Sequence, residues 1–335
     1  MVSAGAAALA LAAALALAGC QTASEPAETC AATAAPDGAA EAQAGAWPRD
    51  VAVGDSQVTI EAAPERIVAL STETGDLVLE LIGPERVAAV AEGSVTPGTG
   101  NQLELAEQVP TSLSMRTSPD PEQILALEPD LVIMTGRHDD EQSAADALAA
   151  SGVPTATFRT GDFATVDGVI ESIGVLGELV GAEDRAAELA DGLRDEVAAV
   201  TDAVADAETA PTTLVLLARG GTPMLMAQHS ATTHLVELAG GASIAAAEGW
   251  RAAVPADPEQ IVALDPEVIL VQDFRDQGLA PFDELLSNPA LAEVRAIADD
   301  RVVLVDAETT SGTAGTRLGE GLRAVAAALH PELAL

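Results

Sequence analysis

Two glutamates, Glu122 and Glu259, occupy equivalent positions in a motif that occurs twice in the chain. From Asp120 to Pro129 and from Asp257 to Pro266, eight of ten positions are identical. In each copy an aspartate precedes a proline, a pair that typically caps and begins a helix, so each glutamate should lie in an exposed first turn. A carboxylate there can meet a cationic partner, or it can simply compensate the helix macrodipole. A repeat this close predicts a duplicated architecture.

Patterns that indicate catalysis are absent from the sequence. It contains no lysine, which rules out a Walker A loop and a Schiff base, and no G-x-S-x-G or H-E-x-x-H pattern. Neither cysteine lies in the part expected to fold. The four histidines are dispersed, whereas a zinc or manganese site needs clustered histidines and carboxylates. We therefore expect a binding protein and not an enzyme; a cryptic hydrolase and a zinc or manganese binder are the alternatives from other classes.

The net charge restricts the partners further. The formal charge is −38 at pH 7, all 15 basic residues are arginine, and tyrosine is absent. A surface this acidic repels phosphate backbones and anionic lipid head groups, so we expect no binding to nucleic acid. The charge by itself also fits a general solubility strategy.

Each copy of the motif must be held by a helix and a strand. Apolar residues lie on one helical face in both copies, and the proline at the end of the motif stops the helix. The apolar runs 131–134 and 268–271 come next and are typical of strands covered on both faces of a parallel sheet. The sequence therefore predicts an α/β fold of two similar lobes with parallel sheets.

A purely helical stretch separates the two alternating regions. Apolar residues at helical spacing predict one helix from 165 to 181 and a second from 183 to 207. At roughly 1.5 Å per residue the second helix spans about 37 Å, which is enough to reach from one lobe to the other. We expect an N-terminal lobe at 58–181, this connecting helix at 183–207, and a C-terminal lobe at 211–333.

The chain begins with an apolar stretch, 1–19, that leads to Cys20. Residues 17–20, L-A-G-C, resemble the lipobox of bacterial lipoprotein signal peptides. The resemblance implies cleavage of residues 1–19 and lipidation of Cys20. A spanning helix or a core helix is the alternative, but the run is short for a membrane span. Residues 20–46 are rich in small residues, proline and acids, and should form a disordered tether. Cys30 then has no intrachain partner, so no structural disulfide is expected.

Several features together resemble one class of ABC-importer solute-binding proteins. They are the lipoprotein signal, the segment PERIVAL at 64–70, the two PEQI-x-AL-x-P copies and the long helix between two lobes. Members of this class capture iron–siderophores, hemin or cobalamin. The resemblance covers residues from about 64 to 333 and implies an extracytoplasmic, lipid-anchored monomer that works with an ABC permease and its ATPase. In this class the glutamates that match Glu122 and Glu259 meet arginines of the permease.

Within this class the second half most resembles the hemin-binding members. The segments concerned are HLVELAGGASI at 234–244, NPALAEVRAIADDRVVLVD at 288–306 and GTAGTRLGEGLRAVAAALHPE at 312–332. The resemblance implies hemin as the transported ligand and no cofactor of the protein's own. Met115 stands where hemin-binding members usually place a tyrosine or histidine that ligates the iron, and a thioether can bind haem iron. A ferric siderophore and cobalamin are the alternative ligands, because the chain has no tyrosine.

Two loop pairs are candidate ligand contacts. Met115 and Arg116 precede the first copy of the motif, and Trp250 and Arg251 lie in the matching loop of the second lobe. An indole face suits a flat macrocycle, and a guanidinium suits the carboxylates of a macrocycle or an anionic siderophore. Met115 could instead fill a core gap, and Trp250 could be a buried anchor.

Three further residues are candidate ligand contacts. His138 follows the carboxyl end of a strand, where parallel-sheet proteins bind ligands, and is an alternative ligand for haem iron. Arg219 and Arg317 are candidate contacts for an anionic ligand, although either could instead form a surface ion pair.

Overall fold

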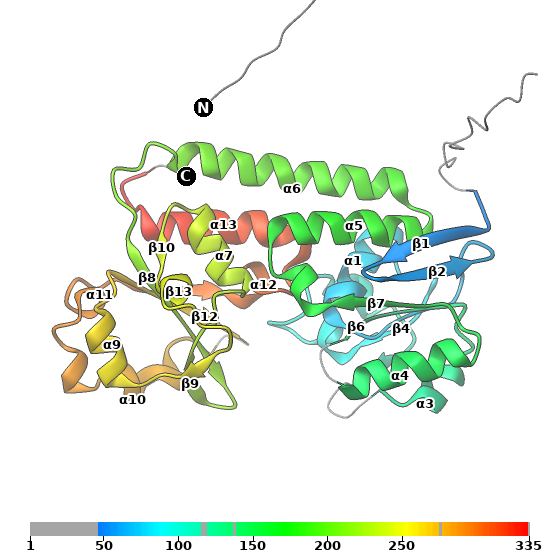
Figure 1. Ribbon diagram of the computed structural model, residues 1–335, viewed down its shortest axis with the longest axis horizontal. Coiled ribbons are helices and arrows are strands. Elements are labelled where there is room, and N and C mark those ends of the chain that lie inside the picture. The colour runs from blue at the N-terminus through cyan, green and yellow to red at the C-terminus, as the bar shows by residue number, and fades with distance from the viewer. Residues whose placement is uncertain (1–45, 115–118, 137–138, 275–276, 334–335) are drawn as a thin grey trace, which may run out of the picture. The chain divides into compact units, whose positions relative to one another are not determined.

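The computed structural model describes residues 46–114, 119–136, 139–274 and 277–333, and all of these belong to one compact unit, 43–335. Within this unit two α/β lobes lie side by side, and a long helix runs along both of them (Figure 1). The predicted signal peptide, the tether up to residue 45 and Cys20 lie outside the described residues. Across the described ranges, none of the helices combines the length and the apolar character that a membrane crossing requires.

The first lobe contains a five-stranded sheet in which every pair of neighbours is parallel, in the order β5-β4-β3-β6-β7. Its strands are β3 (Ile67–Ala69), β4 (Val87–Ala91), β5 (Ser112–Leu113), β6 (Leu131–Gly136) and β7 (Thr155–Arg159). A hairpin of β1 (Arg49–Val53) and β2 (Ser56–Ile60) precedes the sheet, and short helical turns connect its strands: η1 (Glu92–Val95), α2 (Leu103–Ala106) and η2 (Thr160–Phe163). The parallel sheet predicted for this lobe is confirmed.

Helices cover both faces of this sheet. α1 (Thr72–Ile82) and α5 (Val166–Val180) pack on one face, while α3 (Pro121–Leu125) and α4 (Asp139–Ala150) lie on the other. The first five residues of β6 are therefore buried, which explains why the strand is a continuous apolar run rather than an alternating one.

The second lobe contains a six-stranded sheet in the order β11-β9-β8-β12-β13, with β10 beside β8. The strands are β8 (Thr212–Arg219), β9 (Thr222–Leu225), β10 (Ala242–Ser243), β11 (Val254–Pro255), β12 (Val268–Asp273) and β13 (Val302–Asp306). β8, β10, β12 and β13 are parallel, as predicted, but β9 runs antiparallel to both of its neighbours, β8 and β11. The reason is a two-residue turn at Gly220-Gly221, where both φ angles are positive, at 59° and 81°, so β8 folds straight back as a hairpin.

Short helices surround this second sheet. They are α7 (Ala231–Leu238), α8 (Ile244–Ala247), α9 (Pro258–Leu264), η3 (Ala280–Phe282), α10 (Asp283–Leu286), η4 (Pro289–Leu291), α11 (Arg295–Ala298), α12 (Ala307–Thr310), η5 (Gly315–Arg317) and α13 (Leu318–Leu329). The two copies of the sequence motif thus form α3 with β6 and α9 with β12, so the predicted pairing of a short capped helix with a buried strand is confirmed in both lobes.

The connecting helix is α6 (Glu183–Val204), with 22 residues and a length of roughly 33 Å at 1.5 Å per residue. It ends three residues earlier than the predicted position 207. α6 packs on α5 of the first lobe and on α13 of the second, as Figure 1 shows. The packing on α5 is close at Gly177, where a Cβ atom would lie 2.5 Å from the Cβ of Ala186.

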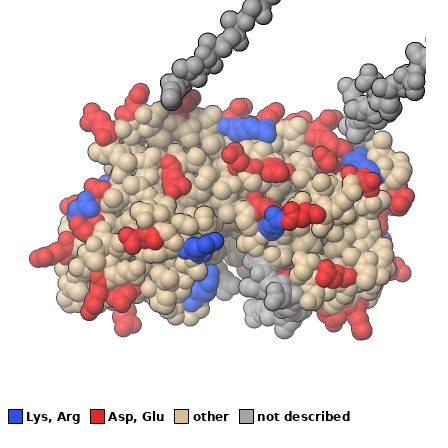
Figure 2. Space-filling view, in the orientation of Figure 1, with Lys and Arg blue, Asp and Glu red and all other residues tan. Residues whose placement is uncertain are grey.

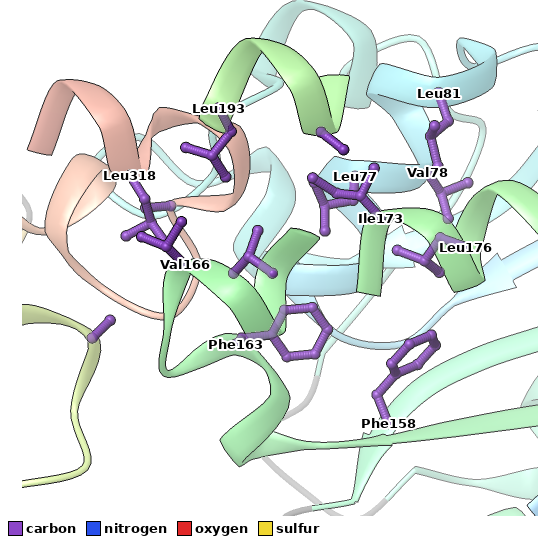
Figure 3. Packing of buried hydrophobic residues seen from close by; sticks show 14 of the residues in the cluster. Leu77, Val78, Leu81, Phe158, Phe163, Val166, Ile173, Leu176, Leu193 and Leu318 are labelled. Atoms are coloured by element: carbon purple, nitrogen blue, oxygen red, sulfur yellow. The ribbon is translucent and has the colours of Figure 1, made fainter. Parts of the chain in front are cut away.

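One hydrophobic cluster runs through both lobes. It contains Leu77 of α1, Ile173 of α5, Leu193 of α6 and Leu318 of α13, together with residues of the sheets on either side. Figure 3 shows Leu318 and Leu193 facing each other, with Val166 next to them. Because buried apolar contacts are close-packed, this shared cluster resists large rotations of one lobe against the other.

Candidate ligand-binding pocket

A pocket of about 560 Å³ lies at the carboxyl ends of β8 and β12 in the second lobe. Its apolar wall is formed by the side chains of Leu217, Met226, Phe274, Pro281 and Phe282. Its polar lining includes Ser230, Thr232, Gln272, Asp273 and Ser311, and Thr99 contributes from the first lobe. A concave, largely apolar pocket with a few convergent polar groups at strand ends is the usual form of a small-molecule site in an α/β protein.

The polar floor of this pocket is a buried hydrogen-bond network around Gln272, which is 3% exposed. Its Nε2 donates to Thr232 Oγ1 at 2.6 Å and to Thr310 Oγ1 at 3.1 Å. Thr232 Oγ1 in turn donates to the Thr310 carbonyl at 2.8 Å, and Thr310 Oγ1 donates to the Asp306 carbonyl at 2.7 Å. A buried network of this kind holds the side chains of the floor in one arrangement.

Asp273 shapes the loop that borders the pocket. Its two carboxylate oxygens accept from the backbone amides of Gln277 and Gly278, each at 2.9 Å. Both oxygens are therefore used to hold the turn that follows β12. We infer that Asp273 positions this loop and is poorly placed to ligate a metal of the ligand.

Arg219 ends β8 and lies at the rim of the pocket. Its side chain is exposed, and within the described residues it makes no hydrogen bond or ion pair. Figure 2 shows a hollow between the two lobes with basic side chains beside it on the side of the second lobe. A free guanidinium there can contact an anionic or electron-rich edge of a ligand.

The two lobes are joined next to the pocket by hydrogen bonds that centre on Asn101. Its Nδ2 donates to the Thr313 carbonyl at 2.6 Å, and its Oδ1 accepts from Arg317 Nη1 at 3.0 Å. The amide of Gly98 donates to Glu308 Oε1 at 2.7 Å. Since Asn101 and Gly98 belong to the first lobe and their partners to the second, these contacts fix the distance between the lobes at this edge.

Asp76 lies behind this junction in α1 and is 4% exposed. Its Oδ2 accepts from the backbone amide of Asn101 at 2.7 Å. Burial raises the pKa of Asp76 to about 7; the hydrogen bonds from Asn101 and Ser94 lower it, and the negative charges of Glu73 and Glu80 raise it. Burial likewise raises the pKa of Glu80, although the hydroxyl of Thr316 donates to that carboxylate at 2.9 Å and opposes the shift.

The two glutamates of the repeat, Glu122 and Glu259, are both exposed at the second position of their helices. Asp120 accepts from the amide of Glu122 at 3.0 Å, and Asp257 accepts from the amide of Glu259 at 2.8 Å. Figure 1 places α3 and α9 on the side of the molecule away from α6. The caps therefore hold both carboxylates toward solvent, one on each lobe.

The structure does not bring the other described candidates together in the pocket. Trp250 is half-buried against the second-lobe core and does not line the pocket, while Arg251 is exposed beside it. Arg317 is committed to the junction between the lobes, where it contacts Asn101, Glu308 and Glu320. Burial by itself would lower the pKa of Arg317, but the neighbouring carboxylates of Glu320 and Glu308 have the larger combined effect. The net result is a pKa above the ordinary value of arginine.

Three candidates, Met115, Arg116 and His138, lie outside the described residues. Among the described residues, no group of three or more His, Cys, Asp and Glu side chains could hold a metal ion. The described histidines have different surroundings: His229 is exposed, His234 is half-buried in α7, and His330 is fully buried with its Nε2 donating to the Ala239 carbonyl at 2.9 Å.

Sequence reasoning missed Gln272, Thr232 and Asn101. A signal for Gln272 was present, because it is the first polar residue after the apolar run 268–271 and so had to lie at the carboxyl end of a buried strand. Asn101 lies in an irregular stretch, and nothing in its local sequence indicates a contact more than 200 residues along the chain.

Comparison with known proteins agrees with this architecture. The profile of the periplasmic binding protein family matches residues 67–309, so the chain belongs to that family, a class of solute-binding proteins and not of enzymes. The chain is 26% identical to the cobalamin-binding protein of Halobacterium salinarum over 280 residues, which cover 82% of this chain and 72% of that protein.

Two further similarities concern iron compounds. The chain is 27% identical over 265 residues to the ferric-anguibactin-binding protein FatB of Vibrio anguillarum, covering 75% of this chain and 78% of FatB. Its fold is similar to that of the periplasmic heme-binding protein RhuT from Roseiflexus sp. RS-1 in apo form, with a TM-score of 0.68 and 27% identity over 80% of this chain and 98% of that one. The predicted class and its two-lobed α/β fold are thereby confirmed.

Proposed function

We propose that this protein is the extracytoplasmic solute-binding component of an ABC importer, which captures a metal complex between its two lobes and delivers it to a permease and its ATPase. The observation that carries the proposal is the pocket at the ends of β8 and β12, to which Thr99 of the first lobe contributes. The two capped glutamates, one on each lobe, are placed to meet cationic groups of the permease. The L-A-G-C sequence before residue 21 supports a lipid anchor at Cys20 and a monomer held at the membrane surface.

The ligand belongs to the group formed by hemin, ferric siderophores and cobalamin. The resemblance of the second half to hemin-binding proteins and the similarity to RhuT support hemin, while two relatives bind cobalamin and ferric anguibactin. Met115 and His138 are the candidate iron ligands for hemin. Arg219 at the pocket rim supports contact with the ligand edge, and Arg116 and Arg251 are further candidates.

Titration of the purified full chain with hemin, cyanocobalamin and a ferric siderophore tests this function. Saturable binding with a shifted Soret band is expected if hemin is the ligand, whereas quenching of tryptophan fluorescence by one of the other two complexes identifies that class. Binding of none of the three at micromolar concentration would contradict the proposed function.

The shared core also predicts how the protein moves. Because α6 and the cluster around Leu193 connect the lobes, we expect ligand binding to cause only a small tilt of the lobes. Small-angle scattering with and without ligand should show nearly the same radius of gyration, and a large decrease would contradict the rigid connection.

A further inference from the structure

The hydroxyl groups around Gln272 determine which way its amide points. The hydroxyl of Thr232 donates its proton to the Thr310 carbonyl, and that of Thr310 donates to the Asp306 carbonyl. Each hydroxyl has only one proton, so both oxygens can only accept from Gln272. The side-chain NH2 group of Gln272 must therefore face the two threonines, and its carbonyl oxygen must point away from them.

The carbonyl oxygen of Gln272 opens onto the pocket. Gln272 lines the pocket although only 3% of its surface is exposed, and its Oε1 accepts no hydrogen bond from the described residues. Oε1 is nevertheless not among the atoms that are sealed inside the protein without a partner. A pocket-facing acceptor that lacks a protein donor needs a donor from the ligand, because an unmatched buried acceptor is costly.

Backbone donors lie beside this acceptor. Ala231 and Thr232, the first two residues of α7, also line the pocket. Amides in the first turn of a helix have no acceptor within the helix, and within the described part of the chain neither of these two donates to another group. The same end of the pocket therefore offers one acceptor and one or two donors.

We infer that this end of the pocket recognises an amide group of the ligand, with Gln272 as the residue that determines specificity. The amide N–H donates to Gln272 Oε1, and the amide carbonyl accepts from the first turn of α7. This inference rests on the proposed function and narrows its ligand class. A carboxylate, such as the propionates of hemin, has no proton to donate at pH 7 and would face Oε1 with a lone pair.

Two ligand classes carry such amides. A corrinoid has primary carboxamides around its ring, and many ferric siderophores have secondary amides in their backbone. Dicyanocobyrinic acid has the corrin ring of cobalamin with carboxylates in place of the carboxamides, but it also lacks the nucleotide loop. The amide is therefore isolated by comparing both ligands in the wild type and in a variant of Gln272.

The experiment measures dissociation constants by calorimetry for the full chain with cyanocobalamin, dicyanocobyrinic acid, hemin and ferrioxamine. The Gln272→Met variant removes the acceptor at similar volume, and both threonine hydroxyls keep their donor bonds to carbonyls, so the fold should persist. Gln57→Met is the matched control, since Gln57 is an exposed glutamine in β2 of the first lobe and does not line the pocket. Thermal unfolding verifies that both variants fold.

We expect an amide-bearing ligand to bind the wild type at least about 10-fold more tightly than its carboxylate counterpart, and Gln272→Met to remove about that factor while Gln57→Met does not. Loss of affinity for ferrioxamine alone would assign the amide to a siderophore, and loss for cyanocobalamin would assign it to a corrinoid. Hemin or dicyanocobyrinic acid as the tightest ligand, or equal effects of the two variants, would overturn the inference and leave the transport function intact. Failure of all four ligands to bind would overturn both.

Discussion

The helices α1 and α7, which face the junction and the pocket from the two lobes, begin in the same way. Ser71 caps α1 by accepting from the amide of Thr74 at 3.4 Å, and Ser230 caps α7 by accepting from the amide of Thr233 at 3.2 Å. In both helices the two hydroxyls also pair, at 2.7 Å and 2.8 Å. The same local sequence, a serine three residues before a threonine, thus produces the same helix start in both lobes.

The residues that follow these caps differ in charge. Glu73 and Asp76 of α1 are buried, whereas the equivalent positions of α7 are Thr232 and Leu235. The first lobe therefore places carboxylates behind the junction, while the start of α7 in the second lobe presents uncharged residues to the pocket. The serine cap thus determines the backbone at the start of each helix. The residues two and five positions after the serine determine which groups each lobe offers to a partner.

The helices α3 and α9, which carry Glu122 and Glu259 and are the proposed docking helices, show the same division. Both are capped by aspartate, and both are followed by a residue in the left-handed region at the same motif position, Glu128 with φ 51° and Asp265 with φ 43°. Their exits are anchored differently. Arg66 donates to the carbonyls of Leu127 and Glu128 in the first lobe, whereas Arg295 in the second lobe donates to the Asp265 carbonyl at 2.6 Å and in addition binds the Asp265 carboxylate at 2.8 Å.

The largest expected effect is on ligand uptake, and it tests whether the proposed docking helices α3 and α9 contribute equally. Reversing both charges with Glu122→Arg and Glu259→Arg should abolish uptake of the ligand in cells that express the importer, because like charges would then meet at the permease. Each single change to alanine should reduce uptake by a similar factor, on the order of 10-fold. The measurement is uptake of labelled ligand at equal amounts of protein.

The control reverses two exposed carboxylates of α6, Asp195 and Asp202, which gives the same change in net charge on a different side of the molecule. This control should transport normally, and all variants should keep the wild-type affinity for the ligand. If the control loses as much uptake as the docking variant, net charge matters and the two capped glutamates have no special role.

Much of the fold could be predicted from the sequence because it depends on local and repeated features. The duplicated motif fixed both helix–strand pairs, and the apolar spacing located α5 and α6 to within a few residues. The hairpin of β8 and β9 also had a sequence signal, since two strands joined only by Gly220-Gly221 must run antiparallel, and the expectation of a parallel sheet in the second lobe did not use it.

The candidate site was harder to predict. The floor around Gln272 depends on which hydroxyls surround it, and those come from α7 and α12, which lie some 40 residues before and after it. Trp250 had the chemistry of a ligand contact, but the structure packs it against the core, since burying its apolar rings there is favourable. Residue type indicated what could bind, and only the fold showed what faces the pocket.

The second expected effect is a pH dependence of stability that comes from the buried Asp76 of α1, which has no counterpart at the start of α7. Asp76 keeps its proton up to about pH 7 in the folded protein, whereas an unfolded aspartate loses it near pH 4, so the folded state binds more protons between these values. Its contribution to the free energy of unfolding is therefore lost as pH rises, by about 2–3 kcal/mol between pH 5 and pH 8. Denaturant unfolding at several pH values measures this slope.

The Asp76→Asn variant removes the titration and should flatten the slope, so that it matches the wild type at pH 5 and is more stable at pH 8. Glu80→Gln is the comparison, because burial also raises the pKa of Glu80 and its removal should reduce the slope in the same direction. A parallel pH profile for Asp76→Asn and the wild type would mean that Asp76 is already ionised in the folded state. The start of α7 carries no buried carboxylate, and Leu235→Val leaves the titratable groups of that helix, His234 and Glu237, in place, so this variant should leave the slope unchanged.

The smallest effect tests the two anchors of the docking helices. Arg66→Ala removes hydrogen bonds to backbone carbonyls, and Arg295→Ala removes one such bond, to the Asp265 carbonyl, together with half-exposed ion pairs with Asp265 and Glu267. Each change should cost about 1 kcal/mol of unfolding free energy. Salt separates them, since exposed ion pairs are screened whereas carbonyl contacts depend less on ionic strength. In 1 M NaCl the cost of Arg295→Ala should shrink while that of Arg66→Ala persists. Equal responses of the two variants to salt would show that the two lobes anchor their docking helices by the same kind of interaction despite their different partners.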